Sequence, residues 1–346
     1  MINILIIQPS VPYYRITFFE ELALKLNEKI TILHFSKKTS IDHPLIKEIL
    51  GEYNSFYSIK TVKGIKGIIK DFNMIITVFD PHWINLFTLP FSCKDKKIIF
   101  WGHGLGKNKI INTVRVFLTR NCQSIITYSN DRKQRLVASG VPKEMIFVAN
   151  NTIHISNSQD SSKNIKKTFL YVGRLQRRKK IDVFFRIFKS HELGSQGYKI
   201  VLIGDGDEEK KYLKDYGEKV GINEYLEFIN GTSDENILRK YFLEAIYYVS
   251  PGAVGLGVLH SFAYGVPVLT MEDKAHGPEF DNIVNHENGM VFKNEDDFKN
   301  QLLSFLEKCK YQKMGYNAYH LYKSQRNINI MVNGFIDAIN YILVKG

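Results

Sequence analysis

The sequence predicts an α/β protein of two domains, each built on a parallel sheet, and three observations support this. Short apolar runs typical of buried parallel strands alternate with helical segments along most of the 346 residues. The polar stretch 150–167, with SNSQDSSKN at its centre, interrupts this alternation and is the best linker candidate. The alternation restarts at Thr168, and a chain of this length ordinarily holds two domains.

The first half begins with a strand at residues 2–7, which the prolines of QPSVP end, and a helix follows from Tyr13. With the strand at 30–35 this forms a βαβ unit, whose ligands bind beyond the carboxyl ends of the strands. Tyr13 and Arg15 follow the first strand directly, so they are either substrate contacts or residues of a helix rim. Further strands are expected at 74–79, 97–101, 124–128 and 146–148, and helices at 110–119 and 131–138.

Residues 59–72, IKTVKGIKGIIKDF, predict a basic amphipathic helix. Lysines recur every three or four residues, and isoleucine and valine form the other face. Such a helix can lie on an anionic membrane surface or can be an ordinary surface helix with solvated lysines. Gly64 and Gly67 weaken it as a helix.

Two histidines follow consecutive strand ends, His82 in DPHW and His103 in WGHG. A histidine between glycines at a strand end can reach a ligand, so His103 is a site candidate, and His82 is a weaker one. Neither has a carboxylate or histidine partner at helical distance, so we expect no metal.

The second half repeats the strand–loop–helix pattern with glycine-rich loops. Strands are expected at 168–172, 199–203, 226–229, 247–249 and 266–269. The first four are followed by loops that contain GR, GDGD, NG and PG, in that order. Helices are expected from Asp182, over 207–220, from Asp234, over 258–263, from Glu295 and finally over 328–344.

The stretch 250–270, SPGAVGLGVLHSFAYGVPVLT, predicts a loop, a helix, a tight turn and a buried strand. Glycines before a helix let backbone amides approach a ligand, and unpaired N–H groups at a helix start suit a phosphate. Glycine-rich loops before helices are also common packing devices, so both interpretations stay open here.

The basic charge of the chain is concentrated in its first half. Residues 1–155 hold 21 Lys and Arg against 11 Asp and Glu, whereas residues 156–346 hold 26 against 24. A basic domain can meet nucleic acid, anionic lipid or a phosphorylated substrate. Nucleic acid is the least favoured partner, because no zinc-finger spacing or RNA-binding aromatic signature is present.

Composition indicates a cytoplasmic globular protein. Three widely spaced cysteines, Cys93, Cys122 and Cys309, argue against a disulfide framework or a cysteine metal cluster. We expect no bilayer-spanning apolar run, and the start MINILIIQPS predicts a strand rather than a signal peptide.

The ordered motifs of residues 168–292 resemble a known family. The order strand–GR–basic cluster–helix, strand–GDG, strand–NG–helix and PGxxGL…AYGVPV is similar to the C-terminal domain of retaining GT-B fold glycosyltransferases of family four. The VPYYR and WGHG stretches also resemble bacterial surface-polysaccharide transferases of this family. The resemblance implies two Rossmann-like domains facing a cleft, at residues 1–160 (acceptor side) and 161–325 (donor side), and a helix over 326–346 returning to the first.

The resemblance also assigns roles to single residues. Gly173, Arg174 and Lys179 match the motif G-R-x4-K, whose two cations would clamp the diphosphate of the donor as it leaves. Gly255 and Leu256 would bind phosphate through backbone amides. No cofactor or metal is implied beyond the nucleotide sugar itself.

Further roles follow from the position of residues in each sheet. The nucleobase would lie near Asn230 and Gly231, and His103 would face the transferred sugar. Tyr13, Arg15 and His82 would belong to the acceptor side.

The sequence departs from the family at two positions. The family motif has two glutamates separated by seven residues, one for the transferred sugar and one for the ribose hydroxyls, and Gly252 and His260 stand there instead. His260 can still bond a ribose hydroxyl, whereas Gly252 can offer only backbone. Glu279, in HGPE after the next strand, is a candidate to replace the lost carboxylate.

We therefore expect a nucleotide-sugar-dependent glycosyltransferase of the hexosyltransferase type in cell-surface polysaccharide biosynthesis. Its acceptor would be a glycan or lipid-linked glycan at the inner membrane face, where the basic first half meets anionic lipid as a peripheral contact. Two alternatives stay open: a non-hydrolysing nucleotide-sugar epimerase, and a nucleotide-binding GT-B protein without catalysis.

Overall fold

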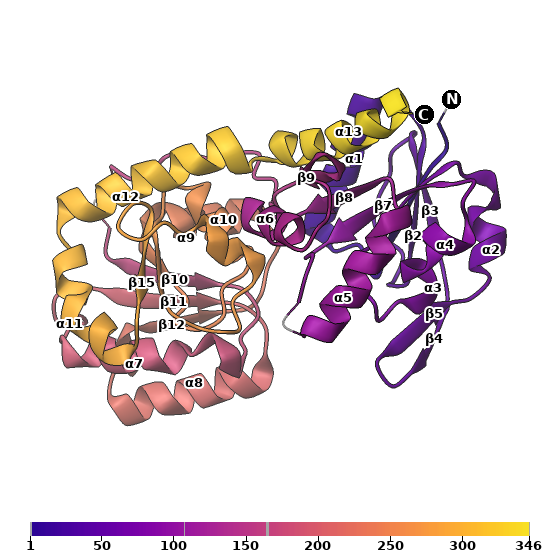
Figure 1. Cartoon of the computed structure of the whole chain (residues 1–346). Coiled ribbons are helices and arrows are strands. Elements are labelled where there is room, and N and C mark those ends of the chain that lie inside the picture. Colours follow the sequence, from indigo (N-terminus) through magenta and orange to yellow (C-terminus); the bar gives the residue numbers. More distant parts are fainter. Residues whose placement is uncertain (1, 107, 164–165, 346) are drawn as a thin grey trace. The chain divides into compact units, whose positions relative to one another are not determined.

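The computed structural model describes residues 2–106, 108–163 and 166–345, and the chain divides into two compact units (Figure 1). Unit 1 comprises Met1–His154 and Asn327–Gly346, and unit 2 comprises Ile155–Arg326. The first boundary lies before residue 160 because the polar stretch is bonded to unit 2. There the N–H of Gln159 donates to the carbonyl of Ala263 at 3.1 Å, and that of Ser161 donates to Tyr264 at 3.3 Å.

Unit 1 contains a parallel sheet in the order β3-β2-β1-β6-β7-β8-β9. Its strands are β1 (Ile4–Gln8), β2 (Ile30–His34), β3 (Ile46–Leu50), β6 (Met74–Val78), β7 (Lys97–Gly102), β8 (Ser124–Thr127) and β9 (Ile146–Val148). The sequence did not predict β3. Its IKEIL pattern is only partly buried because β3 forms the edge of the sheet.

Both faces of this sheet are covered, which explains the continuous apolar runs. Ile4 and Ile6 of β1 pack into one core cluster, and Leu5 and Ile7 pack into another on the opposite face. The helices of unit 1 are α1 (Ile16–Leu26), α2 (Ile65–Ile68), α3 (Ile84–Phe87), α4 (Leu89–Ser92), α5 (Lys109–Leu118), α6 (Asn130–Ala138) and α13 (Ile328–Lys345).

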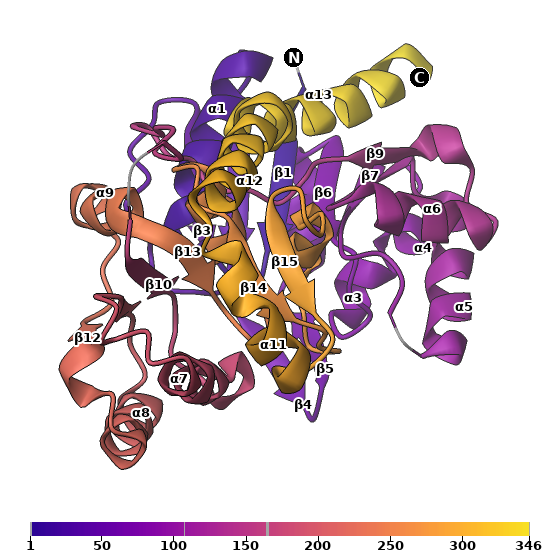
Figure 2. The same ribbon diagram turned by 90° about the vertical axis from the view of Figure 1, so that its left-hand side faces the viewer.

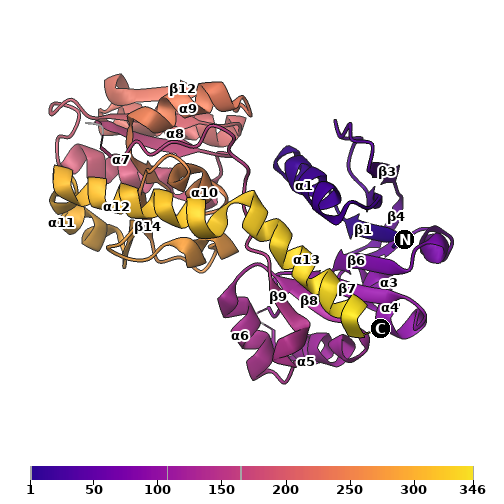
Figure 3. The same cartoon turned by 90° about the horizontal axis from the view of Figure 1, so that it is seen from above.

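Helix α13 packs on α1, β8 and β9 (Figure 3). Met331, Val332 and Phe335 are fully buried in the core cluster that also holds Ile4 and Ile6. The helical stretch from Cys309 to Val344 is long and apolar enough to cross a membrane, contrary to the sequence expectation that no such run exists. The apolar side chains of its α13 part fill the unit 1 core, so its composition is that of a core helix.

The amphipathic helix predicted over residues 59–72 is wrong in its first part, where β5 (Ile59–Val62) pairs antiparallel with β4 (Tyr53–Phe56). Residues 65–71 are helical, as α2 and the 3₁₀ turn Ile69–Asp71 that follows it. Gly64 separates β5 from α2 with a left-handed φ of 63°. Ile59 and Val62 were expected on the apolar face of a helix, but backbone pairing with β4 stabilises their extended conformation.

Unit 2 contains a parallel sheet in the order β12-β11-β10-β13-β14-β15. Its strands are β10 (Thr168–Val172), β11 (Lys199–Ile203), β12 (Leu226–Ile229), β13 (Ala245–Val249), β14 (Val268–Met271) and β15 (Gly289–Phe292). Its helices are α7 (Ile181–Ser190), α8 (Asp207–Val220), α9 (Glu235–Glu244), α10 (Gly257–Phe262), α11 (Glu295–Phe305) and α12 (Lys308–Leu321). Figures 1 and 2 show α7 and α8 on one face of this sheet and α9, α10 and α12 on the other.

Candidate functional site

The two segments expected to bind phosphate leave neighbouring strands of unit 2. Strand β10 lies between β11 and β13, so the strand order reverses there, and ligands of open α/β sheets bind at such a point. The segment from Gly173 follows β10, and the glycine loop from Ser250 follows β13.

Lys179 ties the two segments together. It ends a 3₁₀ turn, Arg177–Lys179, and only 8% of it is exposed. Its Nζ donates to the carbonyl of Ala253 at 2.6 Å, and its own carbonyl accepts from the N–H of Gly252 at 2.8 Å. Burial, aided by the charge of Arg178 and opposed by that of Glu279, lowers the pKa of Lys179 to about 8.

Gly252 is needed for this contact between the segments. A Cβ at this position would lie 2.1 Å from the carbonyl oxygen of Arg178, so no side chain fits. Its N–H is already bonded to Lys179, which places Gly252 as a support for the lysine rather than as a donor contact. A carboxylate at this position is excluded by the same close approach.

Gly255 differs from Gly252, because a Cβ there would enter open space. The backbone N–H groups of Gly255, Leu256 and Gly257 donate no hydrogen bond within the described part of the chain. The N–H groups of Val258 and Leu259 are bonded to Gly255 and Leu256. Three successive unpaired amides, in a loop that also binds a lysine amine, can bind an anion.

Arg174 is exposed, and its guanidinium makes no hydrogen bond or ion pair with any described residue. Gly173 before it has φ +146°, and the hydroxyl of Tyr171 donates to the carbonyl of Arg174 at 2.9 Å, which fixes the backbone. A positioned cation without a protein partner is available for a ligand.

The neighbouring cations all have partners within the protein. Arg177 stacks 3.7 Å from the ring centre of Tyr212, and Arg178 donates to the side chain of Gln176 at 2.8 Å. Lys180 pairs with Asp273 at 2.7 Å.

The segment after β12 is held by the loop after β11. The N–H of Gly231 donates to Asp205 at 2.8 Å, and a Cβ on Gly231 would lie 2.4 Å from the same carboxylate. The side chain of Asn230 accepts from Lys210 at 2.8 Å. Protein groups therefore occupy the Gly231 amide and the Asn230 oxygen, the residues that the resemblance assigns to the nucleobase site.

His260 lies in α10 with 5% of its surface exposed, and its ring packs 4.5 Å from that of Phe242. Its Nε2 is 3.1 Å from Oε1 of Glu235, which also accepts from the hydroxyl of Tyr264 at 2.5 Å. Sequence reasoning missed Glu235. The available signal was an acidic residue in the first turn of the helix that follows the NG loop.

Glu279 lies on a 3₁₀ turn, Pro278–Asn282, and 6% of it is exposed. It lies close enough to Lys179 for its charge to oppose the lowering of the lysine pKa by burial. His276, which sequence reasoning also missed, holds the HGPE segment to the glycine loop. Its Nδ1 accepts from the N–H of Val254 at 3.2 Å, so Nε2 donates to the carbonyl of Met271 at 2.8 Å.

In unit 1, Arg15 is buried and has partners within the protein. It donates to the side chain of Asn151 and to Met331 Sδ, and it lies 5.2 Å from the ring centre of Trp101. Arg15 and Trp101 also line a cavity of about 160 Å³ beyond β1 and β7. The indole N–H of Trp101 has no partner there among the described residues.

The other candidates of unit 1 lie near the surface. Tyr13 is 58% exposed, and Nδ1 of exposed His82 is 2.7 Å from Asp80. His103 follows β7 with its ring 4.8 Å from that of Tyr128. Its ring reaches solvent, yet surrounding protein atoms and the charges of Arg132 and Arg15 lower its pKa, which favours the neutral imidazole.

Among residues 2–106, 108–163 and 166–345, no group of three or more His, Cys, Asp or Glu could hold a metal ion.

Comparisons with known proteins relate the chain to a family and to a fold. The family model described as Glycosyl transferases group 1 matches residues 155–321, which is nearly all of unit 2. No curated protein sequence matches the chain.

Solved structures match over the whole chain at low identity. A glycosyltransferase from Rickettsia africae is 15% identical with a TM-score of 0.76, covering 100% of this chain and 99% of its own. Anabaena HepE in complex with UDP-glucose is 13% identical with a TM-score of 0.70, covering 98% and 100%. The lipopolysaccharide outer core galactosyltransferase WaaB is 17% identical with a TM-score of 0.69, covering 98% and 99%. Unit 2 therefore matches the group 1 glycosyltransferase family, within a chain that has the GT-B fold of two α/β domains with parallel sheets.

Proposed function

We propose that the protein transfers a sugar from a nucleotide-activated donor to a glycan or lipid-linked glycan, with retention at the anomeric carbon. The observation that carries this proposal is the placement of Lys179. Its amine is held on the carbonyl of Ala253, in the same glycine loop as the three unpaired amides of residues 255–257. HepE binds UDP-glucose, which supports a nucleotide sugar as donor.

Release of a nucleoside diphosphate places negative charge on the leaving oxygen, so catalysis needs positive charge at that point. With a pKa of about 8, Lys179 is mostly protonated at neutral pH. Arg174 supplies a second cation from the adjacent strand end, and the amides of the glycine loop complete the phosphate site. The acceptor hydroxyl attacks from the face on which the diphosphate leaves.

The two family glutamates have different replacements in this proposal. Glu279, buried near Lys179, takes the contact with hydroxyls of the transferred sugar. Glu235 takes the ribose contact, because its Oε1 is bonded to His260 while its Oε2 has no partner in the described part of the chain. His260 then positions Glu235 instead of meeting the ribose directly. In unit 1, His103 contacts the transferred sugar, as the resemblance implies.

We assign the enzyme to the hexosyltransferase type and to cell-surface polysaccharide biosynthesis at the inner face of the membrane. The galactosyltransferase WaaB and the S. aureus protein TarM, solved with UDP and α-GlcNAc-glycerol, support a hexose donor and a surface acceptor. The proposal requires no metal, because cations and amides of the chain meet the phosphate charge.

The test measures hydrolysis and transfer with a panel of nucleotide sugars for the parent and for Arg174→Ala. The matched control is Arg177→Ala, which removes an arginine that already has a protein partner. We expect Arg174→Ala to lose about a hundredfold in turnover, the effect of one charge-stabilising group, and Arg177→Ala to stay near the parent. Equal turnover of Arg174→Ala and the parent would show that the diphosphate clamp is misassigned.

One observation favours a second candidate, a protein that binds nucleotide without turnover. The close approach at Gly252 excludes the carboxylate that family members carry there. Nucleotide binding without sugar consumption across the donor panel would select this candidate over the enzyme.

A further inference from the structure

Helix α5 presents apolar side chains to solvent along its length. None of its ten residues is buried. Ile110 is 78% exposed, Val114 48% and Phe117 51%, and their spacing places them on one stripe of the helix. In contrast α7, also ten residues long, buries six of its residues. The apolar stripe of α5 therefore resembles the face of a buried helix, but its side chains are exposed to solvent.

Cations border this stripe. Lys109 begins the helix, and Arg120 follows it with its guanidinium carbon 5.3 Å from the ring centre of Phe117. No Asp or Glu occurs between Lys96 and Asn130 in the sequence. The sequence around the helix therefore carries cations without carboxylates.

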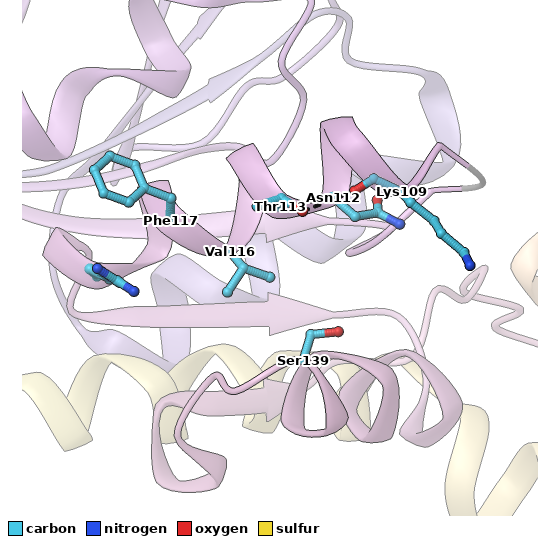
Figure 4. Close-up of a pocket in the computed structure, with 7 residues that line it drawn as sticks. Lys109, Asn112, Thr113, Val116, Phe117 and Ser139 are labelled. Atoms are coloured by element: carbon cyan, nitrogen blue, oxygen red, sulfur yellow. Dashed lines mark hydrogen bonds between the residues drawn. The ribbon is translucent and has the colours of Figure 1, made fainter.

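Two grooves continue this basic surface. One, of about 410 Å³, runs along α5 and faces Ser139 at the end of α6 (Figure 4). Lys109 and Arg120 line it together with Val116 and Phe117. The other, of about 450 Å³, shares Arg120 and is lined by three further lysines, Lys94, Lys96 and Lys97, and by Asp95, which pairs with Lys96 at 3.5 Å.

We propose that α5 docks unit 1 on an anionic lipid bilayer, with its stripe in the interfacial layer and Lys109 and Arg120 on lipid phosphates. An apolar helix face bordered by cations is the pattern of interfacial helices. A second copy of the chain does not fit this surface, because it would bring the same cations face to face. The inference rests on the proposed function for its lipid-linked acceptor, and it assigns the membrane contact to α5 instead of residues 59–72.

The test measures co-sedimentation of the full chain with phosphatidylcholine vesicles, with and without phosphatidylglycerol. One variant combines Lys109→Gln with Arg120→Gln, and another combines Ile110→Ser with Phe117→Ser. We expect the parent to bind only the anionic vesicles, and less at high salt. The charge variant should lose about 25-fold in partitioning, since each cation near the surface contributes about fivefold. The apolar variant should lose binding at both salt levels.

Matched controls lie in unit 2. Lys211→Gln with Lys219→Gln removes the same charge from α8, and Ile237→Ser with Leu303→Ser removes side chains that are 39% and 48% exposed. Both controls should bind like the parent. Equal binding of neutral and anionic vesicles, parent-like binding by the charge variant, or self-association of the parent that the apolar variant abolishes would each overturn the proposal.

UDP binding, followed by thermal shift in the same samples, separates this inference from the proposed function. Loss of vesicle binding with intact UDP binding is the expected behaviour of both α5 variants. A parent that binds UDP but no anionic vesicle overturns the docking surface alone. A parent that binds vesicles but no nucleoside diphosphate overturns the donor assignment alone.

Discussion

The pKa of Lys179 predicts how donor binding changes with pH. If the diphosphate binds only the protonated amine, apparent affinity falls in proportion to the protonated fraction. A pKa of about 8 means that roughly nine-tenths of the lysine is charged at about pH 7 and roughly one-tenth at about pH 9. The dissociation constant for UDP should therefore rise about tenfold over this range. A lysine with an ordinary pKa would stay charged, so it would leave the affinity nearly constant.

The pH dependence of folding stability that Lys179 causes has the opposite sign to that of UDP affinity. Burial lowers the folded-state pKa of Lys179 below its usual value of 10.5. A lysine whose pKa is lower in the folded state makes the protein more stable as the pH rises from the folded-state pKa, about 8, to the unfolded-state pKa. Between about pH 7 and pH 9 this residue therefore stabilises the fold more as the pH rises, while nucleotide affinity falls.

Isothermal titration calorimetry with UDP across this pH range is the assay. Lys179→Met, which keeps the volume of the side chain, should weaken binding by about tenfold to a hundredfold at neutral pH and should abolish the pH dependence. Lys180→Met removes the adjacent lysine, which pairs with Asp273, and should keep the parent profile. A flat profile in the parent, or an unchanged slope in Lys179→Met, would refute the reasoning.

The remaining predictions concern single contacts of the proposed site. Gly252→Ala should destabilise the protein by about 1–3 kcal/mol in denaturant unfolding, because its Cβ meets the carbonyl of Arg178. Gly255→Ala, whose Cβ enters open space, should change stability by less than about 0.5 kcal/mol and yet weaken UDP binding. Equal stability of Gly252→Ala and Gly255→Ala would contradict the packing argument. Glu235→Gln should reduce the preference for UDP over its 2′,3′-dideoxy analogue, and an unchanged preference would remove Glu235 from the ribose site. His103→Ala should lower turnover and leave UDP affinity unchanged, whereas parent-like turnover would exclude a role at the transferred sugar.

Much of the architecture could be predicted from local sequence patterns. Apolar runs such as residues 4–7 are typical of a strand covered on both faces, and their alternation with helices predicts open parallel sheets. The loops after β10 and β13 could be placed at one sheet edge for the same reason. Prediction failed at residues 59–62, which pair with β4 as a strand instead of beginning a helix.

Within the candidate site, the sequence by itself determined which loops carry cations and glycines, because residue type and order along the chain set that chemistry. Tertiary structure alone decided which groups stay available for a ligand. Lys179 is buried against Ala253, Gly252 has no room for a side chain, and Glu235 meets His260 from another helix. These outcomes depend on distances between segments far apart in the chain, and those distances follow from the packing of the whole domain.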